Sequence, residues 1–589
     1  MTLDVERPVD VGTRGAATWG SDAIVDLLRD LDVPYLPMNP GSSFRGLHDS
    51  VVNYGGNHDP QLLLCLHEEI AVSLAHGWAK ATGRLGTAAV HDLVGLMHAS
   101  MAVYDAFCDR TPLLLLGGSG PADPALRRPV DWTHSATTQA QLVRDYVVLD
   151  AEPATAEAAV ADVVRARRRA LSAPRGPAYV SLDAGLQEQL LDRPVARPVL
   201  ERHAPAPPIA PDPESVDRAV ALLAGARSPV VVAGRVGLDA SVVAPLDEVV
   251  RLLGAAYRDD RNWSVLPTAH PQNCTGDEAL LDEADVVLAV DVVDLPALLR
   301  PVGHGARGGS APVRSGPTVI DLSHGDLGLR SWSNAMGAAV ERDVALLADP
   351  VLGLRLLAER LRGAVDGAAA QVRRTSVVAR AAALRARQHA AVAERWDDPV
   401  VSPTRLVGET WAAVRDTDHL LCLRNTRTWP EGLWQLPGAG GYLGHSGGGG
   451  VGYGPGALVG GALAARDRGQ LGVGIVGDGD LLMAAGALWT AAHYRIPALV
   501  VVNDNGSFYN DEPHQAAVAR ERGRPSANSW IGMRIADPCV DIAGLARSYG
   551  CWAEGPVTDP GRLAGALGRG VAAATAGATA VVHVRTSPR

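Results

Sequence analysis

The chain has 589 residues, too many for a single hydrophobic core, so its length predicts three or four domains. Apolar residues make up 47% and charged residues 20%, a composition typical of globular proteins. The formal charge of −11 comes with no long basic run, which argues against a nucleic acid or an anionic membrane as a partner.

The predicted location is the cytoplasm. No apolar stretch approaches the ~20 residues that a membrane span needs. Residues 1–15 are polar and lack the apolar core of a signal peptide. The six cysteines are scattered without a CxxC pair, which is typical of reduced thiols in a chain of this size.

Two changes in composition divide the chain. Residues 191–214 are dense in proline, which favours an extended linker. Residues 366–402 are rich in alanine and arginine, which predicts a second, helical linker. The remaining segments, 15–190, 215–365 and 403–589, each have the length of a domain.

Short apolar runs alternate with amphipathic stretches in all three segments. The apolar runs are, in chain order, 62–66, 86–90, 113–118, 179–183, 229–234, 284–291, 318–323, 471–477 and 498–503. Strands that alternate with helices are typical of parallel sheets covered on both faces. The predicted fold class is therefore α/β, with three doubly wound parallel-sheet domains.

The strongest chemical signal lies in the third segment, where Asp478 follows one apolar run and Asn505 follows the next. The carboxyl ends of parallel strands open into the ligand crevice, so both side chains should lie at one edge of the sheet. With the backbone carbonyl of Ser507 they form an incomplete shell of oxygen ligands. Mg²⁺ takes oxygen ligands and usually completes its octahedron with phosphate and water. The pattern predicts a magnesium-bound diphosphate.

Three motifs resemble those of thiamine diphosphate-dependent enzymes of the acetolactate synthase, benzoylformate decarboxylase and pyruvate decarboxylase-like family. Gly477-Asp478-Gly479 is followed by Asn505 at that family's spacing. His67-Glu68, Gly77-Trp78-Ala79 and Thr82-Gly83 match its HE–x₈–GYA–x₂–TG segment, and Asn39-Pro40-Gly41-Ser42 resembles the NPGS loop of benzoylformate decarboxylase-like members. The resemblance covers nearly the whole chain and implies pyrimidine-binding, middle and diphosphate-binding domains.

The resemblance also implies roles for individual residues. Glu68, rather than Glu69, would be the carboxyl group that activates the aminopyrimidine of the cofactor, while the cofactor supplies the carbanion chemistry. The glycine-rich loop 445–464 would offer the Gly449 carbonyl to the pyrimidine amino group and Val451 as the wedge that bends the cofactor. The residues predicted at the diphosphate are Gly477, Gly479 and Asp480, with Asp478, Asn505 and Ser507 on the metal.

On the substrate side, the resemblance implies that Ser42 contacts the substrate carboxylate and that His91, 23 residues after Glu68, relays protons. Asp92 either orients His91 or is solvated, and His98 is predicted to be a packing residue. The implied reaction is non-oxidative decarboxylation of a 2-keto acid, with release of an aldehyde or carboligation of the enamine to an aldehyde or keto acid acceptor.

Three alternatives remain open: an acetolactate synthase-type carboligase, a catalytically silent scaffold that binds thiamine diphosphate, and a nucleotide-binding α/β protein unrelated to thiamine. No flavin motif is apparent, so FAD is not expected. The family implies a homodimer or homotetramer with active sites at the subunit interface.

Overall fold

The computed structural model describes residues 5–9, 15–260, 263–299, 316–325, 341–426, 429–444 and 446–588. They belong to two compact units. The first unit comprises Met1–Ala206, Asp398–Thr428 and Ser446–Arg589, and the second comprises Pro207–Asp397 and Trp429–His445. The first and third predicted segments therefore share one unit.

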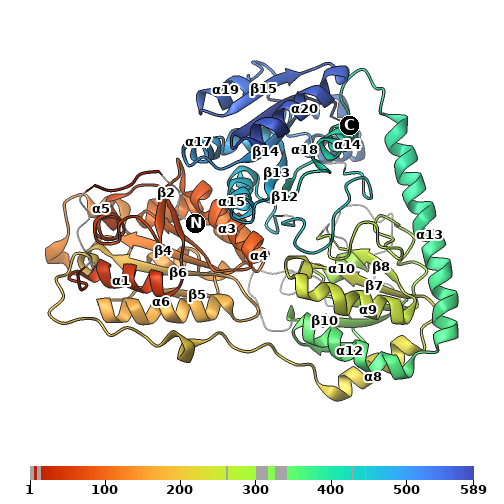
Figure 1. Ribbon diagram of the computed structural model, residues 1–589, viewed down its shortest axis with the longest axis horizontal. Helices are drawn as coiled ribbons and strands as arrows, with labels where there is room; N and C mark the ends of the chain where they lie inside the picture. Colours follow the sequence, from red (N-terminus) through yellow and green to blue (C-terminus); the bar gives the residue numbers. More distant parts are fainter. Residues whose placement is uncertain are drawn as a thin grey trace. The chain divides into compact units, whose positions relative to one another are not determined.

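The first sheet of the first unit has six strands in the order β2-β1-β3-β4-β6-β5, and its neighbouring strands are parallel (Figure 1). Its strands are β1 (Tyr35–Met38), β2 (Gln61–Leu64), β3 (Gly86–Val90), β4 (Leu113–Ser119), β5 (Leu149–Ala151) and β6 (Pro177–Asp183). Its main helices are α1 (Gly20–Asp30), α3 (Glu68–Thr82), α4 (Asp92–Cys108) and α6 (Ala156–Leu171).

Strand β4 shows why this sheet is covered on both faces. Leu114 and Leu116 join a core with α1 and α6, whereas Leu113 and Leu115 join a core with α3 and α4. Successive side chains of a strand point to opposite faces, so an uninterrupted apolar run needs helices on both sides.

The second sheet of the first unit has five parallel strands in the order β12-β13-β14-β16-β15. The strands are β12 (His419–Arg424), β13 (Leu471–Gly477), β14 (Ala498–Asp504), β15 (Trp552–Val557) and β16 (Thr579–Arg585). The helices include α14 (Pro403–Val414), α15 (Tyr453–Asp467), α16 (Asp478–Met483), α17 (Gly486–His493), α18 (Asp511–Glu521), α19 (Ile542–Ser548) and α20 (Pro560–Thr575).

Helices α3 and α15 join the two sheets of the first unit at a very close crossing (Figure 1). A Cβ atom on Gly460 would lie 1.9 Å from the Leu74 carbonyl oxygen, and one on Gly77 would lie 2.1 Å from the Ala457 carbonyl oxygen. Glycine is required at both positions because only a bare backbone allows this approach. The glycine-rich segment therefore has two uses: the glycines in α15 allow close helix packing, and those before α15 belong to the loop.

The second unit holds a five-stranded parallel sheet in the order β11-β10-β9-β7-β8. Its strands are β7 (Pro229–Ala233), β8 (Ala256–Asp259), β9 (Val286–Val290), β10 (Thr318–Ser323) and β11 (Val344–Leu347). Helices α8 (Pro213–Ala224), α9 (Val243–Leu253) and α12 (Pro350–Ala364) contribute to the core on one face, and Ala381 of α13 (Gly367–Glu394) belongs to the core on the other. The Ala/Arg-rich stretch is thus a 28-residue helix.

The predicted fold class, three parallel sheets with helices on both faces, is confirmed. Within the described ranges, no helix is both long and apolar enough to cross a bilayer.

Candidate functional site

Asp478 and Asn505 follow two neighbouring strands at the same edge of the second sheet. Strands β13 and β14 are paired in parallel, with Gly477 opposite Asn503. Asp478 comes directly after β13 and Asn505 directly after β14. The structure therefore places both side chains at the carboxyl edge, where parallel sheets bind their ligands.

Asp478 has the surroundings expected of a cation ligand. Its side chain is only 3% exposed, and its Oδ2 atom has no hydrogen-bond partner among the described residues. Burial and the neighbouring carboxylate of Asp504 raise the pKa of Asp478 to about 7. A buried carboxylate oxygen without a partner is costly unless a cation or a proton neutralises it. This residue set therefore fits a hard divalent cation such as Mg²⁺.

Asp504 adds a permanent negative charge behind Asp478. Burial alone would raise the pKa of Asp504, but His583 and Arg585 outweigh burial and lower it. The Asp504 carboxylate lies 2.5 Å from His583 Nε2 and accepts a bond of 2.9 Å from Arg585. Asp504 is thus engaged by His583 and Arg585, whereas Asp478 keeps an oxygen without a partner among the described residues.

The other two predicted metal ligands are joined by a local turn. The Ser507 N–H donates to Asn505 Oδ1 over 2.9 Å, and the Ser507 hydroxyl donates to Glu512 over 2.5 Å. Because the hydroxyl is engaged by Glu512, the Ser507 carbonyl is the atom to consider as a ligand. The Asn505 oxygen has a second lone pair for a cation.

Asp480 is predicted to contact the cofactor, and in the structure its carboxylate accepts hydrogen bonds from two protein groups. It accepts 2.7 Å from the Gly452 N–H and 2.9 Å from Asn425 Nδ2. Burial raises the pKa of Asp480. The carboxylate therefore holds the start of α15 in place, which explains an acidic residue so close to a predicted diphosphate.

The glycine-rich loop before α15 uses glycine where its backbone is left-handed. Gly449 and Gly452 adopt φ of +67° and +103°, in the left-handed region that favours glycine. Open space surrounds Gly449, since a Cβ atom there would meet no atom within 4 Å. Val451 between them is 43% exposed. Gly479 also needs a bare backbone, since its Cβ would lie 2.6 Å from the Phe508 ring.

Glu68 is the first residue of α3 and is only 5% exposed. Its Oε2 atom lies 3.2 Å from His98 Nδ1 on α4, and its Oε1 atom faces Gly95, where a Cβ would be 3.0 Å away. The His98 ring also stacks on His67 at 4.7 Å. His98, predicted to be a packing residue, thus stacks on His67 and also places a polar atom on Glu68, with 59% of its side chain exposed.

His91 comes directly before α4, the helix that carries His98. Its Nδ1 atom forms a 2.8 Å hydrogen bond with the Ser43 hydroxyl, and Gly41 lies directly against its ring. Burial, together with the neighbouring His134, lowers the pKa of His91, so the imidazole is neutral near pH 7. A neutral ring can accept a proton, and the imidazolium that forms can then release it.

Asp92 is neither solvated nor bonded to His91. It is 3% exposed, and the Ser135 hydroxyl donates to its carboxylate over 3.3 Å. Burial raises the pKa of Asp92 to about 6, and its φ of 43° is strained for a residue with a side chain. Backbone strain of this kind is concentrated at functional sites.

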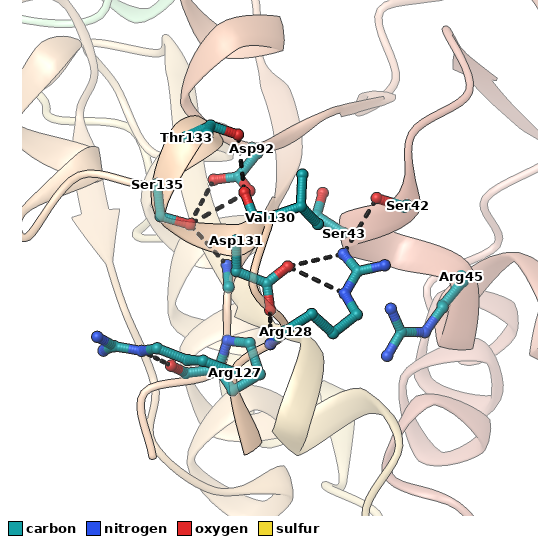
Figure 2. Close-up of polar contacts among 12 residues, drawn as sticks. Ser42, Ser43, Arg45, Asp92, Arg127, Arg128, Val130, Asp131, Thr133 and Ser135 are labelled. Atoms are coloured by element: carbon teal, nitrogen blue, oxygen red, sulfur yellow. Dashed lines mark hydrogen bonds and ion pairs between the residues drawn. The ribbon is translucent and has the colours of Figure 1, made fainter. Parts of the chain in front are cut away.

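Ser42 is held by an arginine that the sequence analysis did not identify. Arg128 Nη2 donates to the Ser42 hydroxyl over 3.2 Å and to Asp131 over 2.7 Å (Figure 2). Ser42 and Arg45 also line one surface cavity of about 400 Å³. The structure thus pairs His91 with Ser43, and Ser42 with Arg128.

The sequence analysis named His98 but did not predict its contact with Glu68. His98 lies in α4, seven residues after His91, which is the N-cap of that helix. Arg128 lies in a proline- and arginine-rich loop without periodicity, so nothing in the sequence connects it to Ser42.

Comparisons with known proteins agree with this geometry. Residues 18–142 match the model of the thiamine pyrophosphate enzyme N-terminal TPP binding domain, and residues 425–584 match that of the C-terminal TPP binding domain. Benzoylformate decarboxylase of Pseudomonas aeruginosa is 26% identical over 87% of this chain and 90% of its own length. Acetolactate synthase of Bacillus subtilis is 24% identical over 46% of this chain and 47% of its own.

Solved structures share the fold across almost the whole chain. A thiamine diphosphate-dependent 4-hydroxybenzoylformate decarboxylase of Rhodococcus jostii is 20% identical, with a TM-score of 0.75, and the match covers 97% of this chain and 99% of that one. Benzoylformate decarboxylase of Polynucleobacter necessarius is 18% identical, with a TM-score of 0.76 and the same coverage. This chain belongs to the family of thiamine pyrophosphate-dependent enzymes that includes benzoylformate decarboxylase and acetolactate synthase.

Proposed function

We propose that this protein uses thiamine diphosphate and Mg²⁺ to decarboxylate a 2-keto acid, and then releases an aldehyde or joins the remaining fragment to a second carbonyl compound. The observation that carries the proposal is the buried Asp478 oxygen without a partner, at the sheet edge that also holds Asn505. The cation of a metal-bound diphosphate would coordinate this oxygen and neutralise its charge.

Glu68 acts on the other end of the cofactor. Its burial at the start of α3 brings a carboxyl group to a site from which water is largely excluded. The bound cofactor supplies the carbanion chemistry, and Glu68 holds or moves a proton at the pyrimidine nitrogen. His98, which links Glu68 to solvent, positions this carboxylate.

His91 and the loop at Asn39–Ser42 border the place for the substrate. His91 holds or delivers a proton at the reacting carbon, and Ser42 contacts a carboxylate of the substrate. Gly95 connects this part of the site to Glu68, since a Cβ atom there would lie 3.2 Å from His91 Cβ and 3.0 Å from Glu68 Oε1.

The active site is proposed to form between two copies of the chain in a homodimer or homotetramer. Within one chain, it is Glu69 rather than Glu68 that faces the glycine-rich loop, with its Oε1 atom 3.4 Å from a Cβ placed on Gly452. Glu68 is turned toward α4, so the diphosphate end of its cofactor is assigned to a second chain.

The test is CO₂ release from a panel of 2-keto acids by the protein supplied with thiamine diphosphate and Mg²⁺, with and without acceptor aldehydes, followed by product identification. Release of aldehyde supports a lyase, and acetolactate from pyruvate alone supports an acetolactate synthase-type transferase. Cofactor binding without CO₂ release from any acid would overturn the proposal in favour of a silent scaffold.

A further inference from the structure

The loop that carries Ser42 lies beside two arginines. The Arg128 guanidinium is fixed by Asp131, whose carboxylate accepts from Nε over 3.0 Å, from Nη2 over 2.7 Å and from the Arg128 N–H over 2.7 Å. Asp131 is only 5% exposed, and Arg45 as well as Arg128 lowers its pKa against the effect of burial. Arg45 and Arg128 are therefore close enough to act on one carboxylate (Figure 2).

Both guanidinium groups retain donors for a ligand. The contacts of Arg128 with the described residues use Nε and Nη2, which leaves Nη1 for an anion. Arg45 pairs with Glu188 through Nε at 2.6 Å and through Nη2 at 2.8 Å, and the two side chains are 43% and 38% exposed. This pair does not use Nη1 of Arg45, which can donate to an anionic ligand.

The cavity next to Ser42 has the size and the lining for a short carbon chain with a polar end. It encloses about 400 Å³, with Met38, Pro40 and Phe44 as its apolar lining and Ser42, Arg45 and His48 as its polar lining. Gly41, which also lines the cavity, lies directly against the His91 ring, since a Cβ atom on Gly41 would be 2.2 Å from His91 Cγ. The cavity and the proposed reacting centre are thus neighbours.

The carboxylate that leaves as CO₂ is a poor match for two arginines. Decarboxylation removes its negative charge, so strong ion pairs with it would stabilise the reactant more than the transition state. A second anionic group that stays on the substrate keeps its charge throughout the reaction. Binding to that group lowers the energies of reactant and transition state equally and positions the chain without slowing the chemistry.

From this geometry we infer that Arg45 and Arg128, beside Ser42, form a subsite for a second, retained anionic group, so that the substrate is a dianionic 2-keto acid. The inference rests on the proposed function and names its substrate class. The distal group is a carboxylate or a phosphonate, and both accept paired hydrogen bonds from guanidinium groups.

The activity test compares 2-oxoglutarate with its δ-amide, 2-oxoglutaramate, which has the same length and one charge fewer, and with 4-phosphono-2-oxobutyrate. The holoenzyme is expected to prefer a dianion over the amide by about tenfold or more in kcat/KM. Arg45→Gln and Arg128→Gln should each reduce that preference toward one, a loss of about tenfold, through KM rather than kcat. Whichever dianion is preferred identifies the distal group.

Two further variants sharpen the test. Glu188→Gln removes the competing carboxylate and should lower KM for the dianion. Arg127→Gln is the matched control, because Arg127 bonds to the carbonyls of Pro121 and Ala122 and is turned away from Ser42 (Figure 2). The Arg127→Gln variant should prefer the dianion over the amide as strongly as the unmodified enzyme does. The inference is overturned if the amide is used as well as the acid, or if Arg45→Gln and Arg128→Gln leave the preference unchanged.

Binding without turnover separates this inference from the proposed function. Glutarate, an unreactive dianion, should raise the melting temperature of the holoenzyme more than butyrate does, and Arg128→Gln should abolish the difference. If no 2-keto acid is consumed but glutarate still stabilises in an arginine-dependent way, the proposed function fails and the anion subsite stands. If 2-keto acids are consumed but glutarate has no effect, the subsite fails and the function stands.

Discussion

Glu68 and Glu69 are adjacent carboxylates at the start of α3 with different surroundings. Glu68 faces α4 and bonds to His98, whereas Glu69 faces Gly452, and burial and Asp480 raise the pKa of Glu69. A helix turns by about 100° per residue, so neighbouring residues look toward different partners. The position of each glutamate on the helix therefore decides which carboxyl group faces α4 and which faces the glycine-rich loop.

Glu68→Gln should lower kcat by about 100-fold or more, because an amide cannot move a proton as a carboxylic acid does. The change is nearly isosteric, so the melting temperature should change little. Steady-state kinetics at saturating thiamine diphosphate and Mg²⁺ measure the loss. Glu69→Gln should lower kcat much less, and an equal loss of kcat in the two variants would contradict the assignment of Glu68.

The ends of strands β13 and β14 form the feature that carries the metal prediction. Asp478 ionises at a pKa of about 7 rather than 3.8, because it is buried next to Asp504. Between these two values the folded protein binds a proton that the unfolded chain has released. The contribution of Asp478 to stability therefore falls as the pH rises from about 4 to about 7.

Mg²⁺ and the proton compete for Asp478, since only the ionised carboxylate binds a cation. The increase in melting temperature on adding thiamine diphosphate and Mg²⁺ should therefore be larger at pH 8 than at pH 6. In Asp478→Asn, the cofactor-free protein should melt about 2 °C or more above the unmodified protein at pH 8, because the buried charge is gone. The gain from cofactor and metal should disappear in this variant. A gain of the same size in both proteins would contradict a metal ligand at Asp478.

The crossing of α3 and α15 is the second feature at the scale of elements. Gly460→Ala places a Cβ 1.9 Å from the Leu74 carbonyl oxygen, so the helices must separate and stability should fall by about 1–3 kcal/mol or more. Gly568→Ala in α20 is the matched control, because its Cβ would meet nothing within 4 Å. It should be neutral or stabilise by up to about 1 kcal/mol. Denaturant unfolding of the two variants measures the difference, and similar changes in both would argue against the close crossing.

At the scale of the whole molecule, the proposed sharing of active sites between chains has a sharp consequence. In a mixed dimer of Glu68→Gln and Asp478→Asn chains, one site carries both changes and the other carries neither. If the two variants are unfolded together and refolded, half of the dimers are mixed and about one quarter of the unmodified activity should return. If the refolded mixture were no more active than each variant alone, Glu68 and Asp478 of one chain would serve the same cofactor.

The sequence alone determined the α/β class, the three parallel sheets and the places of Asp478 and Asn505 at the ends of two strands, because apolar runs and the residues that follow them are local patterns. Tertiary structure decided the partners: His98 on Glu68, Asp480 on Gly452, and Arg128 on Ser42, 86 residues apart in the chain. It also decided that the first and last predicted segments share one unit through α3 and α15. The physical reason is that a hydrogen bond forms only when folding brings two atoms to the right distance within a few tenths of an ångström. No short pattern in the sequence specifies that distance.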